Sequence, residues 1–200
     1  MEITAQMVKE LREATGAAVL DCKKALEENS GDLDKAKAYL AKKGLAAAAK
    51  KAERQASEGL VETYTHPGGR VGVMLEVNCE TDFVANTEQF RTLAHDLALH
   101  IAFASPQYVD VTDVPDALVE AQKAVFRKEA LDEGKPEKVI DTIVEGKLAK
   151  FYSEICLLGQ PFVRDGDVTV GDLIIQAIAE LKENILVRRF ARFELGEGES

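Results

Sequence analysis

The apolar side chains of this sequence follow two periods, and the change between them divides the chain near residue 57. Up to about residue 44 they recur every three or four residues, which predicts amphipathic helices separated by caps and glycines. The expected helices run from a Thr4 cap to Gly16, from about Ala18 to Asn29, and from an Asp32 cap to Gly44. Three helices this short predict a bundle with a small core.

The stretch that follows, LAAAAKKAERQASEG, is expected to be a connecting helix. Its four consecutive alanines give strong helix propensity, but it has no wide apolar face with which to enter a core. A basic tail that binds nucleic acid is the alternative. The positive charges are few for that role and stand near Glu53 and Glu58, so the connecting helix is the better interpretation.

Beyond this stretch the apolar period shortens to two. Apolar residues alternate strictly from Val71 to Val77, which predicts a strand with one buried face, and the turn PGGR joins it to a preceding strand in GLVETYTH. Helices are predicted at about 87–104, 116–133 and 137–155, and a helix from about Val170 leads to a strand around 185–195. Strands at both ends with helices between them favour an α+β domain on an antiparallel sheet.

Composition and charge narrow the class of protein. The chain has 200 residues, 46% of them hydrophobic, and a net charge of −10. Residues 1–56 carry a net +2 and the remainder carries −12, so direct binding to nucleic acid is not expected. The apolar runs fall short of the roughly 20 residues of a membrane span. The charged start MEITAQMVKELRE lacks a signal-peptide core, so we expect a cytoplasmic protein without membrane contact.

Cysteine and histidine are too scattered to suggest a metal site. The cysteines are Cys22, Cys79 and Cys156, and the histidines are His66, His95 and His100. With no C-x-x-C pair, the cysteines are expected to be small buried apolar residues, with a reactive thiol or an intermolecular disulfide as alternatives. No metal and no cofactor are therefore predicted.

Few patterns in the sequence point to catalysis. It contains no G-x-x-x-x-G-K-[ST], no G-x-G-x-x-G after a strand, no H-E-x-x-H and no G-x-S-x-G. DGDVTVGD lacks the glycine and glutamate of a calcium loop, so a turn followed by a Thr169 helix cap is the better interpretation. Spacing leaves open a catalytic pair of Cys79 with His95 or His100, but the apolar neighbours of His100 favour a structural role. These observations favour a binding module over an enzyme.

Two apolar features have more than one interpretation. Val19 and Leu20 begin the second helix, and one of them is expected to point outward, either as a scattered surface residue or as a contact for a partner helix. In the strand–helix seam NCETDFVANTEQF, Asp82 could cap a helix while Phe83 folds back into the core. The alternative is that Phe83 is displayed as a wedge for another protein's pocket.

Four long segments, in this order, closely resemble the bacterial translation elongation factor Ts family. They are VKELREATGAAVLDCKKALEENSGDLDKAKAYLAKKG, LEVNCETDFVA, GKPEKVIDTIVEGKLAKFYSEICLLGQPFV and RFARFELGEG. The resemblance implies a guanine-nucleotide exchange factor that binds elongation factor Tu with GDP, promotes GDP release and leaves when GTP binds. It also implies no enzymatic activity, no cofactor and no bound nucleotide, consistent with the missing P-loop.

The same resemblance implies a domain organisation and two groups of partner contacts. Residues 1–45 correspond to a ubiquitin-associated-like three-helix domain, 46–57 to a connecting helix, and 58–200 to an α+β core that dimerises and binds the GTPase. The contacts implied in the first domain are Arg12, Val19, Leu20 and Lys23. Those implied in the core, where the family's segment enters the GTPase near its Mg²⁺ site, are Thr81, Asp82, Phe83 and Val84.

The chain departs from the longer members of this family. Those have two related core halves and a coiled-coil insertion, whereas here TEQFRTLA runs straight into HDLALHIAFASP, so one half is expected to be absent. Nothing in the sequence resembles the coiled coil. The resemblance to short members, which pair their cores, implies a symmetric homodimer. The competing hypotheses are an adaptor whose core only dimerises, with Phe83 buried, and a thiol enzyme that uses Cys79.

Overall fold

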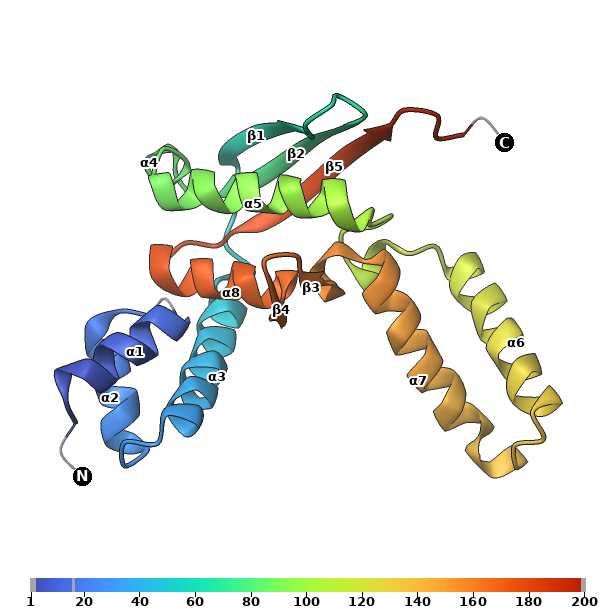
Figure 1. The fold of residues 1–200 in the computed structure, drawn as a ribbon, viewed down its shortest axis with the longest axis horizontal. Coiled ribbons are helices and arrows are strands. Elements are labelled where there is room, and N and C mark those ends of the chain that lie inside the picture. Colours follow the sequence, from blue (N-terminus) through green and yellow to red (C-terminus); the bar gives the residue numbers. More distant parts are fainter. Residues whose placement is uncertain (1–2, 16, 199–200) are drawn as a thin grey trace.

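A computed structural model describes residues 3–15 and 17–198 of the chain (Figure 1). The helices are α1 (Ala5–Thr15), α2 (Val19–Glu28), α3 (Leu33–Lys51), α4 (Asp82–Ala85), α5 (Glu88–Ala104), α6 (Asp116–Asp132), α7 (Glu137–Ile155) and α8 (Val170–Leu181). The strands are β1 (Glu58–Thr65), β2 (Val71–Cys79), β3 (Pro161–Phe162), β4 (Asp165–Thr169) and β5 (Leu186–Glu194). This mixture of helices with antiparallel strands confirms the predicted α+β class.

The first three helices pack around a small apolar core. Their side chains with no exposed surface are Leu11, Cys22, Ala25, Leu26 and Ala36. Two of the predicted caps are present, since Thr4 accepts a hydrogen bond from the N–H of Met7 at 3.3 Å and Asp32 accepts one from the N–H of Lys35 at 3.0 Å. The predicted helix end at Gly16 lies outside the described residues.

The third helix is longer than the sequence pattern suggested. The prediction that it ends at Gly44 is wrong, because α3 continues to Lys51 and takes in much of the expected connecting helix. A Cβ atom at position 44 would lie 3.4 Å from Ile175 Cγ2, at van der Waals contact, so Gly44 lies where α3 packs against α8. The end of α3 then packs on the core domain, with Lys51 buried and its ammonium 3.5 Å from the carbonyl oxygen of Ile178.

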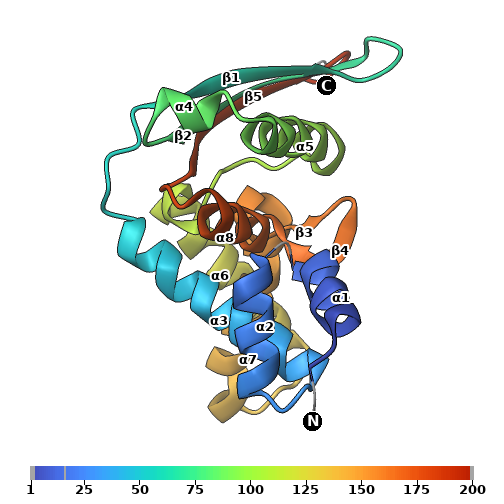
Figure 2. The same ribbon diagram turned by 90° about the vertical axis from the view of Figure 1, so that its left-hand side faces the viewer.

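The core domain is built on a three-stranded antiparallel sheet of order β1-β2-β5. The predicted hairpin is confirmed, and Val73, Leu75 and Val77 of β2 face inward with at most 5% of their surface exposed. Figure 2 shows the sheet along one side of the molecule, with α4, α5 and α8 all on its inner side. The helices predicted at 87–104, 116–133 and 137–155 each match an observed helix within one residue at either end.

The segment DGDVTVGD is the second strand of a small hairpin and the start of α8. Strands β3 and β4, which the sequence pattern did not predict, pair antiparallel. Thr169 caps α8 as predicted, because its hydroxyl accepts from the N–H of Asp172 at 3.1 Å while the Asp172 carboxylate accepts the Thr169 N–H. Such a capping box uses these acidic and hydroxyl groups to start a helix.

Helices α6 and α7 form a long antiparallel hairpin that extends away from the rest of the molecule (Figure 1). The sequence pattern did not predict that these two helices pair with each other. The hairpin has an apolar seam of its own that includes Phe126, Ala130, Ile140, Ile143 and Val144. The break Gly134-Lys135-Pro136 separates the two helices in the sequence, and a local pattern does not show whether helices on either side of such a break pack on each other.

Candidate functional site

The strand–helix seam that follows β2 folds into the one-turn helix α4. Its N-cap is Thr81, whose hydroxyl accepts a hydrogen bond from the N–H of Val84 at 3.3 Å. The interpretation of Asp82 as the cap is therefore wrong by one position, because Asp82 is already the first helical residue. The chain then passes into α5, which Thr87 caps through the N–H of Phe90 at 3.3 Å. Two caps within seven positions make this seam a defined corner.

Within this corner the two apolar side chains point in opposite directions. Val84 is 6% exposed and belongs to the core beneath the sheet, whereas Phe83 is 79% exposed. The interpretation in which Phe83 folds back into the core is wrong, and the adaptor hypothesis that required it loses its support. Val84 anchors the turn, while Phe83 and the exposed Asp82 are presented to solvent.

Two residues that the sequence pattern did not single out hold this corner in place. Glu183, in the loop between α8 and β5, accepts hydrogen bonds from the backbone N–H groups of Glu80 and Thr81. Its neighbour Asn184 donates its own backbone N–H to Glu80 Oε1 at 2.6 Å. These contacts join residues more than 100 positions apart in the sequence, so no local pattern reveals them.

The N-terminal residues expected to contact a partner lie on the surface of the bundle. Val19 and Leu20 are 53% and 75% exposed, so both of them point outward and not only one. Arg12 is exposed, and so is Lys23, which forms an ion pair with Glu27 at 3.8 Å. Helices α2 and α4 lie toward the same side of the molecule in Figure 1.

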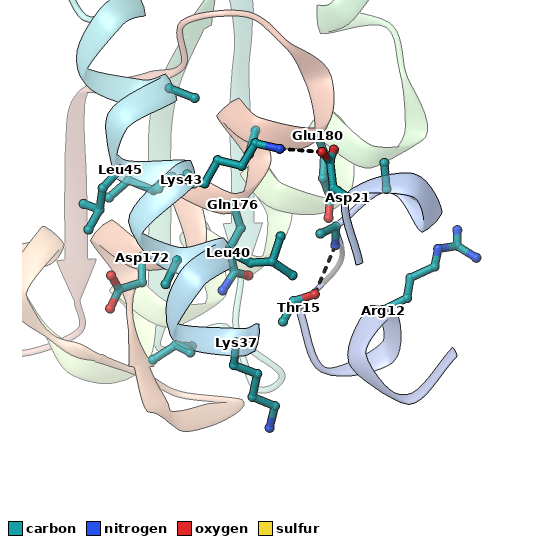
Figure 3. A pocket seen from close by; sticks show the side chains of 18 of the residues that line it. Arg12, Thr15, Asp21, Lys37, Leu40, Lys43, Leu45, Asp172, Gln176 and Glu180 are labelled. Atoms are coloured by element: carbon teal, nitrogen blue, oxygen red, sulfur yellow. Dashed lines mark hydrogen bonds and ion pairs between the residues drawn. The ribbon is translucent and has the colours of Figure 1, made fainter. Parts of the chain in front are cut away.

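A pocket of about 710 Å³ lies between the bundle and the core domain (Figure 3). Helices α1 to α3 line it on one side, and β4 and α8 line it on the other. Lys43 donates a 2.6 Å hydrogen bond to Asp21 there, which lowers the pKa of the Asp21 carboxyl. Arg12 and Val19 also line the pocket, so two of the expected contact residues border the junction between the bundle and the core.

The three cysteines are buried and unpaired, as predicted. Burial raises the pKa of the Cys79 thiol to about 11 and also raises the pKa values of Cys22 and Cys156. The Cys79 thiol donates to the carbonyl oxygen of Thr81 at 3.2 Å. A buried, protonated thiol is neither a good nucleophile nor accessible to a second subunit, so the reactive-thiol and disulfide alternatives lose their support.

The histidines of the α5 helix have hydrogen-bond partners other than a thiol. His95 Nδ1 lies 3.0 Å from Glu62 Oε1 at the surface. His100 is 1% exposed, and its Nε2 lies 3.0 Å from Gln160 Oε1 while its Nδ1 accepts the N–H of Val163 at 3.2 Å. The structural role predicted for His100 is confirmed, and a general-base role has no geometric support.

Two further classes of site can be assessed in the described part of the chain. Among residues 3–15 and 17–198, no three His, Cys, Asp or Glu side chains are placed to hold a metal ion together. Within those same residues, no helix is both long and apolar enough to cross a bilayer.

An exposed aromatic ring beside a carboxylate, on a corner held by caps, is suited to a protein partner, so the fold and the site define an α+β binding protein. The family model described as Elongation factor TS matches residues 2–197. Elongation factor Ts of Caldanaerobacter subterraneus subsp. tengcongensis is 60% identical over 98% of this chain and 98% of its own length. The proteins of the same name from Moorella thermoacetica and Heliobacterium modesticaldum are 59% and 58% identical over 98% of this chain, and over 97% and 91% of their own lengths. The chain belongs to the elongation factor Ts family.

Proposed function

We propose that this protein is a guanine-nucleotide exchange factor of translation elongation, acting in the cytoplasm on the GTPase elongation factor Tu. Family membership over nearly the whole chain supports this role, and the observation that carries its mechanism is the 79% exposure of Phe83. The protein binds the GDP-bound GTPase, promotes GDP release and stays bound until GTP binds. It supplies binding energy and no covalent chemistry, and it needs no nucleotide or cofactor of its own.

The Thr81–Val84 segment acts near the Mg²⁺ site of the GTPase. GDP is held there largely by a phosphate-binding loop and by Mg²⁺, which bridges phosphate oxygens to the protein. Burying the Phe83 ring between elements of the GTPase contributes about 1.5–3 kcal/mol. If the ring fits only when the Mg²⁺-side elements have moved, this energy favours the state that holds GDP weakly. The Asp82 carboxylate enters the same region, where it repels phosphate oxygens or competes for groups that hold the ion.

The N-terminal bundle provides a second point of attachment. Its exposed Val19 and Leu20 form a small apolar patch at the start of α2, with the positive charges of Arg12 and Lys23 nearby in sequence. Apolar side chains at a helix start with a charged surround suit a helical surface on the partner's nucleotide-binding domain. Attachment at this patch holds the corner against the GTPase while the Phe83 ring is inserted.

The proposed function predicts that GDP and this protein each weaken the binding of the other to the GTPase. By linkage, the factor by which the protein weakens GDP binding equals the factor by which GDP weakens binding of the protein, typically about 5–150-fold. We expect the protein to accelerate release of a fluorescent GDP analogue and to co-purify with the nucleotide-free GTPase. Added GDP should then dissociate the complex. A complex that is unaffected by saturating GDP, or an unchanged release rate, would contradict the proposal.

We also propose that the protein is a symmetric homodimer formed through the outer face of its sheet. Val61, Met74 and Phe193 are 59%, 55% and 73% exposed on this face, opposite to the one that α5 covers. Glu76 and Arg189 pair beside them at 2.8 Å. A face with an apolar centre and one ion pair can pack on a second copy of itself, as an isologous interface requires.

Introducing a charge at the centre of this face should separate the subunits. Met74 lies on the middle strand, so Met74→Lys places two lysines in a buried, two-fold related position and should raise the dimer Kd at least about tenfold. Sedimentation velocity measures the change. Leu131→Lys is the control, because Leu131 is similarly exposed, at 54%, on the α6–α7 hairpin. Dissociation by Leu131→Lys with a stable Met74→Lys dimer would move the interface to the hairpin.

A further inference from the structure

The loop between α8 and β5 places a carboxylate directly behind the corner that displays Phe83. Glu183 Oε2 accepts the backbone N–H groups of Glu80 at 3.1 Å and Thr81 at 3.0 Å. Its other oxygen, Oε1, accepts the Thr81 hydroxyl at 2.6 Å. Both oxygens of a single side chain are thus engaged by the two residues that immediately precede α4.

The Thr81 hydroxyl passes this constraint on to α4. A hydroxyl has one proton, and Thr81 donates it to Glu183, so an oxygen lone pair is left to accept the N–H of Val84 at 3.3 Å. Hydrogen bonds in such a chain polarise and strengthen one another. Asp82 and Phe83 therefore lie between one residue fixed by the Glu183 carboxylate and another, Val84, that is buried in the core.

Hydrogen bonds between this loop and the corner run in both directions, and the loop also binds Arg54 in a third segment of the chain. Glu80 returns a carboxylate oxygen to the N–H of Asn184 at 2.6 Å, and it also pairs with Arg54 at 3.5 Å. The Asn184 side chain donates to the carbonyl oxygen of Arg54 at 2.9 Å. Lys182 adopts a left-handed conformation, with φ at 64°, which turns the chain out of α8 and toward the corner. The loop thus holds both the corner and the chain that leads from α3 into β1.

We propose that Glu183 is a positioning residue for nucleotide exchange, which holds the Phe83 corner in its binding geometry before the GTPase arrives. This inference rests on the function proposed above. A helix of four residues is too short to be stable alone, so its orientation depends on tertiary contacts. A segment that is already ordered loses little conformational entropy on binding. The Phe83 ring can then enter the partner without a preceding rearrangement of the corner.

The test is a double-mutant cycle in which exchange is the readout. Glu183→Gln keeps the shape of the side chain but replaces one acceptor oxygen with an amide donor. It can therefore no longer accept the N–H of Thr81 on one oxygen and the Thr81 hydroxyl on the other. We expect it to lower kcat/KM for release of a fluorescent GDP analogue roughly tenfold, as for loss of a charge-assisted hydrogen bond. In the Phe83→Ala background the same change should have little further effect, because Glu183 acts through Phe83.

The outcomes separate this inference from the proposed function. A wild-type rate for Phe83→Ala would overturn both, whereas a slow Phe83→Ala beside an unaffected Glu183→Gln would overturn the positioning role alone. Equal losses in the two backgrounds would indicate a general structural role and would also overturn it. Glu129→Gln is the matched control, because it removes a carboxylate that binds Lys147 at 2.8 Å on the distant hairpin.

A second pair of variants carries the test if Glu183→Gln does not fold, as judged by circular dichroism and thermal unfolding. Thr81→Val replaces with a methyl group the hydroxyl that caps α4 and links Glu183 to Val84, and Thr81→Ser restores the hydroxyl. Slow exchange with Thr81→Val and recovery with Thr81→Ser would support the relay. Equal rates for the two variants would contradict it.

Discussion

Replacing Phe83 with alanine is expected to slow GDP release from the GTPase by about 10–100-fold, because a buried phenyl ring contributes about 1.5–3 kcal/mol and each 1.4 kcal/mol is a factor of ten. The loss should appear in kcat/KM, since the ring is used only in the complex. The fold should be unaffected. Phe83 is 79% exposed, and substitutions at such surface positions change the free energy of unfolding by about 0.5 kcal/mol or less. Stopped-flow release of a fluorescent GDP analogue measures the rate, and urea unfolding measures the stability.

Phe103 provides a matched control for this experiment. It is the same residue type with nearly the same exposure, 77%, but it lies at the far end of α5 from the corner. Phe103→Ala should exchange like the wild type. Wild-type exchange by Phe83→Ala would contradict insertion of the ring, and equal losses in both variants would indicate a general effect of exposed aromatic surface.

Replacing His100 with leucine is expected to lower the free energy of unfolding by about 2–5 kcal/mol, because one buried and one partly buried group lose their hydrogen-bond partners. The groups that lose their partner are the side-chain oxygen Oε1 of Gln160 and the backbone N–H of Val163. Gln160 also donates to the carbonyl oxygen of Glu154 at 2.8 Å, so the imidazole joins α5 to the base of the α6–α7 hairpin. Urea unfolding measures the change. His95→Leu is the control, since His95 pairs with Glu62 at the surface and should cost about 1 kcal/mol or less.

The same histidine should make the wild-type protein less stable in mild acid. Burial lowers the pKa of His100, so below about pH 6.5 the unfolded chain binds a proton there that the folded chain does not. The contribution of neutral His100 to the free energy of unfolding is therefore fully present above the pKa of the unfolded chain. It is lost as the pH falls from there toward the pKa of the folded chain. The slope is at most about 1.4 kcal/mol per pH unit for one site. His100→Leu should remove this component of the slope, and an unchanged slope in that variant would contradict the assignment.

Most of the secondary structure could be predicted because its causes are local. The alternation from Val71 to Val77 repeats every two residues, and the Thr169 cap lies next to the helix that it starts. Both patterns need only neighbouring residues. The prediction at Gly44 was wrong because a glycine ends helices in many sequences, whereas here α3 continues through Gly44 and packs beside Ile175 on a helix distant in sequence. The cause of the error is a tertiary contact.

For the candidate site too, some features follow from the local sequence and others from tertiary packing. The sequence pointed to the Thr81–Val84 segment, but it left open whether Phe83 was buried or displayed, and it placed the cap on Asp82. The structure shows that Thr81 is the cap and Val84 is the buried anchor, so Phe83 must face outward on a single helical turn. Of four residues that are consecutive in sequence, only the tertiary packing determines which one enters the core.

The sequence by itself therefore determined the α+β class, the positions of most elements, and the segment that carries the exposed aromatic ring, since periodicity and capping depend on neighbours in the chain. Only the tertiary structure decided that α3 is continuous, that α6 and α7 form one hairpin, and that Phe83 is displayed. It alone revealed Glu183, which reaches the corner from 102 positions away. Contacts at that separation depend on how β2 and β5 pair, and no local pattern of side chains encodes that pairing.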